Sequence, residues 1–257
     1  MLDLQRHRPN LLAQARAAAI DHRFDEAARL AKQVLTAAPG CLPALRILAW
    51  AQLELGDERA PATFCDCAEL DPEDARAEVG QAIWYQQREQ HDHAVTHWVH
   101  AWELDPHNQP IRRALVRLTG ELPDSPLAEG IGLLRVGRWE EAAELLRTLH
   151  TENSSRPAPA ATLGLIAALR ALAQYRQAAD LAVALYAVAP KCVKGLLYVA
   201  AIEEAEGRTL RGRELLARAE GADPGLMLFG DLVRELFAPS PAPESFRASR
   251  PVLAPAR

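Results

Sequence analysis

The sequence predicts an all-α protein, a right-handed α-solenoid of about six helical hairpins, on three observations. Aromatic residues make up only 5% of the 257 residues, and period-two runs of valine, isoleucine and threonine are nearly absent, which disfavours strands. Prolines that close helices recur at spacings of 33, 34 and 34 residues, at Pro39, Pro72 and Pro106 and then at Pro190 and Pro224. Small residues keep the same period, at Ala27, Ala60, Ala94, Ala142, Ala178 and Gly212.

The plainest copy of the repeated unit begins at Gly137. This glycine ends one helix, because glycine readily adopts the left-handed conformation of a helix C-terminus, and Trp139 packs in the turn. Glu140 and Glu141 stand at the head of the next helix, where the helix dipole favours acids, and Ala142 lets two helices approach closely. One hairpin cannot bury its apolar face alone, so successive hairpins must stack and share a continuous core.

The repeated unit resembles the tetratricopeptide repeat family over roughly residues 8 to 224. Besides the closing prolines, the resemblance rests on Phe24-Asp25-Glu26-Ala27, Ala60 with Phe64, Ala94 with Trp98, Trp139-Glu140-Glu141-Ala142 with Leu146, and Tyr175-Arg176-Gln177-Ala178. It implies that the first helix of each hairpin lines a concave groove that binds a polypeptide. It also implies a protein without catalytic activity.

Two added helices interrupt the repeats. The spacing of 48 residues between Ala94 and Ala142 exceeds one repeat by 14, which predicts an extra helix from Gln109 to Gly120. A comparable helix, from Gly225 to Phe237, is predicted after the sixth repeat. We interpret both as caps, since the last apolar face of a repeat array must be covered. The predicted organisation is a three-repeat block with its cap at 8–121, a second at 124–238 with a loop at 153–159, and a disordered proline-rich tail at 239–257.

Composition argues against several classes of function. A net charge of −5 and a pI of about 5.9 give no overall positive field for nucleic acid or an anionic membrane. No apolar run reaches the ~20 residues of a membrane span, and the first residues lack the apolar core of a signal peptide, so we expect a cytoplasmic protein without membrane insertion. The cysteines are too few for a disulfide framework and are expected to be mostly small buried hydrophobes: Cys41, Cys65, Cys67 and Cys192.

The sequence carries no motif of a catalytic or cofactor site. Gly-x-Ser-x-Gly, a glycine-rich phosphate loop, a dinucleotide fingerprint and His-Glu-x-x-His are all missing, so we predict no enzyme activity and no cofactor. His93, His97 and His100 fall at i, i+4 and i+7 on one helix stripe and have the donor chemistry for Zn²⁺ or Ni²⁺. In register with the family they face the convex surface, and no fourth ligand is evident nearby. We therefore interpret them as a solvated polar face and predict no metal.

The candidate binding surface is the inner groove that the resemblance implies. Its positions combine large apolar side chains with mostly basic charges in a protein that is acidic overall, which fits a partner segment with apolar anchors and acidic flanks. Trp50 is the anchor we favour most, and the alternative for the aliphatic positions is that they belong to the core. The groove residues are Leu12, Arg16, Ala19, Arg46, Trp50, Leu53, Arg76, Val79, Ile83, Gln87, Leu127, Ile131, Leu134, Arg135, Leu163, Arg170, Lys194 and Leu197.

These observations predict a non-catalytic scaffold or adaptor, a subunit or assembly factor of a larger complex, that binds an apolar-acidic segment of another protein. The alternative is a repeat protein that associates with itself into a homo-oligomer. Some members of the family clamp a C-terminal carboxylate with lysine and asparagine. Here those positions hold Leu12, Arg16 and Ile47, so that binding mode is not supported.

Overall fold

The computed structural model describes residues 2–152 and 158–237, and every regular element within these ranges is helical. The predicted tail at 239–257 and most of the predicted loop at 153–159 lie outside the described residues. In chain order the elements are α1 (Leu2–Ile20), α2 (Phe24–Ala37), α3 (Leu42–Glu54), α4 (Ala60–Leu70), α5 (Ala75–Gln87), α6 (His91–Leu104), α7 (Gln109–Thr119), α8 (Pro126–Arg135), α9 (Trp139–Glu152), α10 (Pro159–Ala171), α11 (Tyr175–Val188), α12 (Val193–Ala205), α13 (Thr209–Ala222), the 3-10 turn η1 (Pro224–Leu226) and α14 (Gly230–Phe237).

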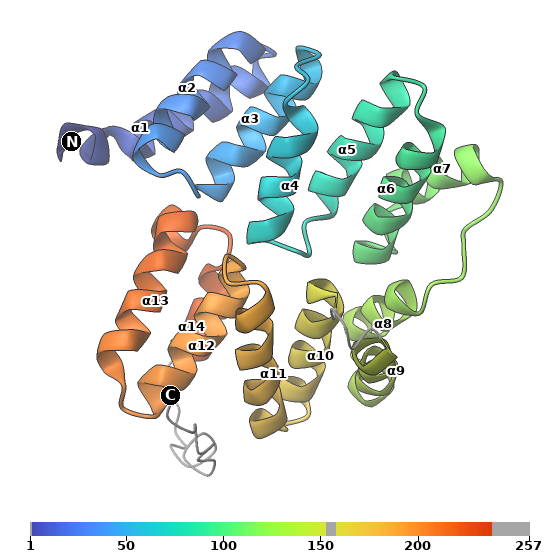
Figure 1. Cartoon of the computed structure of the whole chain (residues 1–257), viewed down its shortest axis with the longest axis vertical. Helices are drawn as coiled ribbons and strands as arrows, with labels where there is room; N and C mark the ends of the chain where they lie inside the picture. The colour runs from blue at the N-terminus through green and yellow to red at the C-terminus, as the bar shows by residue number, and fades with distance from the viewer. Residues whose placement is uncertain (1, 153–157, 238–257) are drawn as a thin grey trace, which may run out of the picture.

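The helices form hairpins in sequence order, which confirms the predicted α-solenoid. The pairs are α1 with α2, α3 with α4, α5 with α6, α8 with α9, α10 with α11, and α12 with α13, and each hairpin packs on its neighbour. Figure 1 shows α1–α6 in one row and α8–α13 in a second row opposite to it. We call these rows the first and second blocks, and we call the surface formed by the first helices of the hairpins the inner face.

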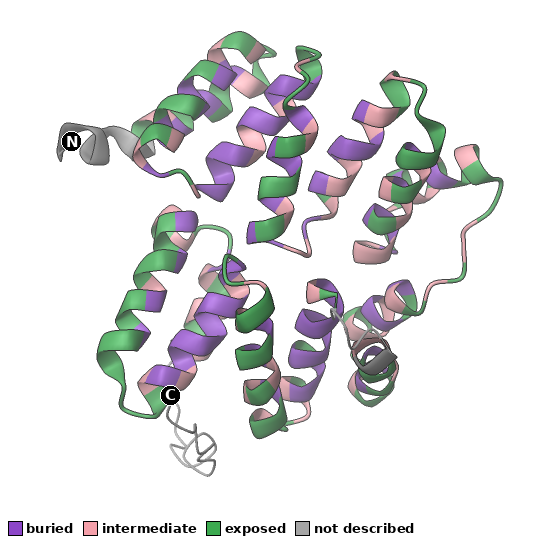
Figure 2. Cartoon of the chain, viewed as in Figure 1, coloured by how far each residue is buried: buried purple, intermediate pink, exposed green. Residues whose placement is uncertain are grey.

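The helices pack closely where the sequence places small residues. Gly80 of α5 lies against the ring of Phe64 in α4, and a Cβ atom there would stand 2.1 Å from the nearest ring carbon. Only glycine fits without moving one helix. The first helices have neighbours on several sides, so α3, α10 and α12 are buried along most of their length (Figure 2).

The two blocks touch at two places. At one, α8 packs against α6, and Ala128 joins a buried cluster with Trp98, Trp102 and Leu115. The predicted helix at Gln109–Gly120 is present as α7, but it covers only part of the first block, because the stack continues into α8. At the other, a second buried cluster contains residues of both blocks, among them Phe64, Leu70, Val193 and Leu197.

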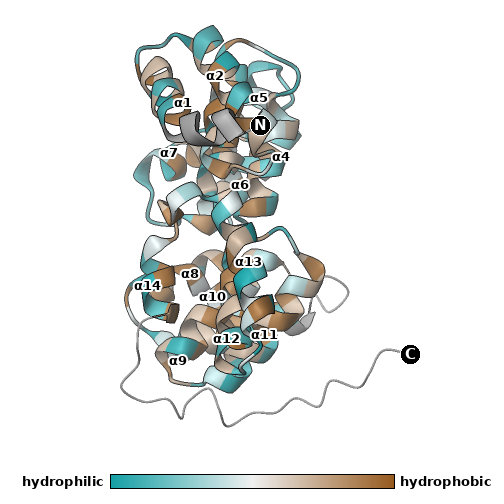
Figure 3. Cartoon of the chain, turned by 90° about the vertical axis from the view of Figure 1, so that its left-hand side faces the viewer, coloured by the Kyte–Doolittle hydropathy of each residue, from teal (hydrophilic) through white to brown (hydrophobic). Residues whose placement is uncertain are grey.

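The helix predicted from Gly225 to Phe237 begins five residues later, at Gly230, which corrects that prediction. The cause is a tight turn: Gly225 and Leu226 both have positive φ, and the backbone N–H groups of Leu228 and Phe229 donate to the Asp223 carboxylate at 2.7 and 3.1 Å. The turn reverses the chain, so α14 packs on α12. Figure 3 shows α14 on the same side of the molecule as α7 and α8. Within the described ranges, no helix has both the length and the apolarity to cross a bilayer.

Candidate functional site

Several of the predicted groove residues belong to the core. Leu12 packs in a buried cluster with Val34, and Leu53 and Ile131 are also buried. Leu163 and Leu197, on the first helices of the second block, are at most 2% exposed. For these positions the alternative interpretation as core holds, which corrects their assignment to an open groove. The reason is that stacked hairpins bury the aliphatic stripe of each first helix against the next hairpin.

The basic residues of the inner face are mostly paired within the chain. Arg46 donates to Asp74 at 2.7 Å and to Asp71 at 2.9 Å. These two acids lie in the turn between α4 and α5, so the Arg46 guanidinium ties α3 to the next hairpin. Further pairs join Arg135 to Asp105, Arg170 to Glu235, and Lys194 to Glu73. The predicted basic groove is therefore largely neutralised by the protein's own acids.

Burial and charge oppose one another around the contact between the blocks. Burial raises the pKa of Asp71, although Lys194 and Arg46 stand nearby and lower it. Burial disfavours the charge of Lys194, but the attraction of Glu73 and Asp71 outweighs it and raises the pKa of the ammonium group. A second ion pair, between Lys191 and Glu69 at 2.7 Å, lies in the exposed part of the same contact.

Part of the inner face of the first block remains accessible. Trp50 is half-buried and meets Phe64 edge to face, with ring centroids 5.5 Å apart. Val79 and Ile83 of α5 are also half-buried. The accessible charged and polar positions are Arg16, Arg76 and Gln87, and neither arginine makes an ion pair with another side chain of the described residues.

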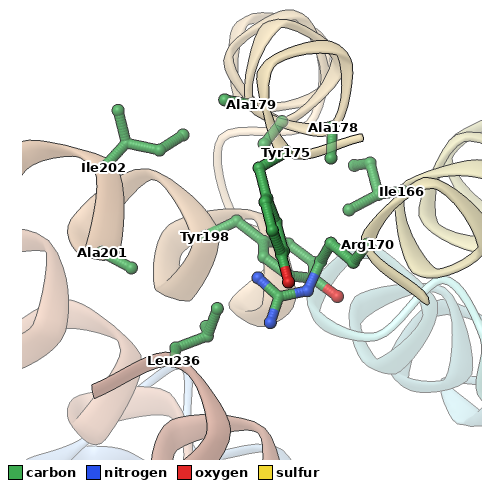
Figure 4. Close-up of a pocket in the computed structure, with 10 residues that line it drawn as sticks. Ile166, Arg170, Tyr175, Ala178, Ala179, Tyr198, Ala201, Ile202 and Leu236 are labelled. Carbon is green, nitrogen blue, oxygen red and sulfur yellow. The ribbon is translucent and has the colours of Figure 1, made fainter. Parts of the chain in front are cut away.

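The inner face of the second block is covered by α14. Glu235 of this helix pairs with Arg170 of α10 at 2.6 Å, and Arg170 lies 5.4 Å from the ring centroid of Tyr198 in α12. Figure 4 shows Leu236 of α14 pointing toward the same group of side chains. The cavity left beneath Leu236 has a volume of about 10 Å³, roughly room for one water molecule. Burial raises the pKa of Tyr198 to about 12.

A larger cavity lies between the blocks, away from most of the predicted groove residues. This cleft has a volume of about 750 Å³ and takes its walls from both blocks. Of the groove positions only Leu127 lines it, and Leu134 is half-buried within the second block. Cys65 lines the cleft as well, and burial raises the pKa of its thiol. The remaining cysteines are buried, as predicted for most of them: Cys41, Cys67 and Cys192.

One wall of the cleft carries a cluster of a carboxylate and two histidines. His97 Nδ1 lies 2.8 Å from Glu78 Oε2, and His100 Nδ1 lies 3.7 Å from the same oxygen. Tyr85 stacks on His97 with ring centroids 5.2 Å apart and nearly parallel planes, and also stacks on His93. Burial by itself would raise the pKa of Glu78, but the attraction of His100 and the hydrogen bond with His97 outweigh it and lower that pKa to about 2. The carboxylate in turn raises the pKa of His100.

This geometry corrects the interpretation as a solvated face for His97 only, because His93 and His100 are exposed. The side chain of His97 is only 20% exposed, and His93 stands outside the cluster. The pattern of α6 could not indicate Glu78, because this residue lies on α5, the other helix of the hairpin. The packing of α5 on α6 in the hairpin brings Glu78 of α5 opposite His97 and His100 of α6.

Comparison with known proteins gives no assignment for this chain. No protein-family model matches it, and no curated protein matches it. Among solved structures, a mutant form of MamA is 16% identical, with a TM-score of 0.36 over 73% of this chain and 98% of that chain. A similarity this low carries no argument about function, so the site must be interpreted from its own residues.

Proposed function

We propose that the protein is a non-catalytic scaffold that binds an apolar-acidic helical segment of a partner protein on the inner face of the first block. In a larger complex it serves as a subunit or assembly factor. Stacked helical hairpins offer a long continuous surface that suits an amphipathic partner helix.

The observation that carries this proposal is the position of α14. This helix places Leu232 and Leu236 against two buried clusters, one within the second block and one shared by both blocks, while Glu235 pairs with Arg170. It is an apolar helix with an acidic flank lying on the inner face, the chemistry predicted for a partner segment. The chain therefore contains an internal example of the proposed interaction.

The first block provides the matching surface for a segment from another protein. Trp50, Val79 and Ile83 are apolar and only half-buried, and Arg16 and Arg76 are exposed cations. Aromatic side chains at the centre of an interface contribute most to affinity, and cations at its rim attract an acidic segment. Trp50 would insert between apolar residues of the partner, with Arg16 and Arg76 facing its acids.

The proposal is tested with a labelled peptide of residues 228–237, which carries the sequence of α14. Fluorescence anisotropy should show binding to the full chain, and Trp50→Ala or Arg76→Glu should weaken it at least about tenfold. Trp50→Ala could disturb the fold, so the second variant is needed. Arg76 is exposed, and its charge reversal should leave the fold intact. Arg213→Ala, an exposed arginine on α13, is the matched control and should bind normally.

Two results would reject the proposal. In the first, Arg170→Ala weakens peptide binding while Trp50→Ala and Arg76→Glu leave it unchanged. The peptide then only displaces α14 from its own position on the second block. In the second, light scattering shows that the wild-type protein is a homo-oligomer and that the Trp50 and Arg76 substitutions dissociate it. The inner face then serves self-association instead.

A further inference from the structure

We propose that Glu78, His97 and His100 form a Zn²⁺ site in the wall of the cleft between the blocks. Each of these three described residues offers one ligand atom, a histidine nitrogen or a carboxylate oxygen, and the three atoms lie within 4.8 Å of one another. Two imidazole nitrogens and one carboxylate oxygen are a donor set that zinc accepts with three protein ligands. This inference is independent of the partner-binding proposal, since it concerns other side chains on another surface.

The distances from the Glu78 oxygen to the two histidine nitrogens lie close to the value for a tetrahedral ion. Ligand atoms about 2.05 Å from zinc in tetrahedral geometry stand roughly 3.3 Å from each other. Glu78 Oε2 lies 2.8 Å from His97 Nδ1 and 3.7 Å from His100 Nδ1, so the observed distances lie on either side of this value. All three ligand atoms lie within 4.8 Å of one another, so the side-chain ends must move closer together to share one ion.

Hydrogen bonding between α5 and α6 does not by itself explain why both histidines turn toward Glu78. The contact of Glu78 with His97 is a normal hydrogen bond, and it would satisfy both groups. His100 turns the same nitrogen toward the same carboxylate oxygen at 3.7 Å, which is too long for a good hydrogen bond. Three groups with lone pairs thus converge on one point, and a Zn²⁺ ion at that point would replace the proton shared by Glu78 and His97.

The hairpin also holds the ligands in place before a metal arrives. His97 and His100 are three residues apart on α6 and therefore share a face of that helix. The Tyr85 ring stacks on His97 in a nearly parallel plane and limits its rotation. Such preorganisation lowers the cost of collecting ligands around the ion.

The site would keep one position open toward the cleft. All three ligands line the cavity of about 750 Å³, and three protein ligands leave the fourth tetrahedral position for water or for a side chain of a bound partner. Open zinc positions of this kind exchange ligands.

The test uses untagged, metal-free full-length protein titrated with Co²⁺, which reports tetrahedral coordination by a strong visible absorption band. One equivalent should produce the band, and Zn²⁺ should displace it. His97→Ala, His100→Ala and Glu78→Gln should each lower the affinity at least about tenfold. His91→Ala is the matched control, because His91 is an exposed histidine of the same helix outside the cluster.

A second measurement covers variants whose fold is in doubt. Zn²⁺ should raise the unfolding temperature of the wild-type protein and of His91→Ala, since a ligand that binds only the folded state stabilises it, and should leave His97→Ala and His100→Ala unchanged. The proposal is overturned if the band is absent, if Co²⁺ binds with the weak spectrum of octahedral coordination, or if His91→Ala loses as much affinity as the cluster variants.

Discussion

Replacing Gly80 by alanine tests the packing that the repeat imposes on α4 and α5. The new Cβ would lie 2.1, 2.4 and 2.5 Å from three carbons of the Phe64 ring, which is 1% exposed. Overpacking of a core costs roughly 1–3 kcal/mol, and contacts this short with a rigid ring place the cost at the upper end. Alanine recovers about 1 kcal/mol of helix propensity. We expect a net destabilisation of about 2 kcal/mol.

The assay is urea unfolding followed by circular dichroism, with Gly221→Ala as the matched control. Gly221 also lies in a helix, but a Cβ there meets no atom within 4 Å, so the substitution should stabilise by up to about 1 kcal/mol. The Gly80→Ala/Phe64→Leu double variant should lose less free energy of unfolding than the sum of the losses in the two single variants. The smaller leucine side chain removes the contact with the new Cβ. If Gly80→Ala is neutral, or if the double variant is strictly additive, α4 and α5 do not pack as described.

Three further predictions concern charged and docked groups. Arg46→Ala should lower the free energy of unfolding by about 2 kcal/mol in chemical denaturation, because Asp71 and Asp74 are left buried without their shared cation; an unchanged midpoint would contradict this. The pKa of Glu78 is lowered to about 2 in the folded state, so the ionised carboxylate stabilises the fold at pH values above the normal carboxyl pKa. This stabilisation is lost as the pH falls toward 2. Glu78→Gln should therefore flatten the acid limb between about pH 5 and 2, measured by urea midpoints. Leu236→Asp should release α14 alone, seen as faster hydrogen exchange at 230–237 with normal protection elsewhere, whereas global loss of protection would show that α14 is integral to the second block.

The hairpin architecture was predictable because it depends on local, repeated signals. A glycine, a small residue and a closing proline at a fixed period indicate where each helix begins and ends, and the extra helix at Gln109 was found from a broken period alone. The helix at Gly225 was placed too early because periodicity does not describe a single capped turn. There the Asp223 carboxylate holds two backbone N–H groups and redirects the chain onto α12.

The candidate site was less predictable because its contacts join different hairpins. The stripe of arginines on the first helices suggested an open basic groove, but Arg46 finds Asp71 and Asp74 more than twenty residues later in the chain. A pattern within one helix records which face a residue occupies. It does not record what the neighbouring hairpin places opposite that face, so neither these pairs nor Glu78 beside His97 could be read from periodicity.

The position of His97 within its repeat yields a final prediction. When the repeats are aligned on their small residues, the other repeats carry at this position Leu30, Thr63, Leu145, Leu181 and Leu215. The third repeat thus has an ionic cluster where most of the other repeats have an apolar contact. Replacing a buried polar pair by apolar residues is often stabilising.

We therefore expect His97→Leu combined with Glu78→Leu to abolish Zn²⁺ binding and to raise the free energy of unfolding of the metal-free protein by about 1 kcal/mol, measured by urea unfolding in the presence of a chelator. Glu78→Gln alone, which keeps the histidine, is the control and should not gain stability. If the double variant is instead less stable than the wild type without metal, the cluster serves the fold of the hairpin and the argument for a metal ligand set fails.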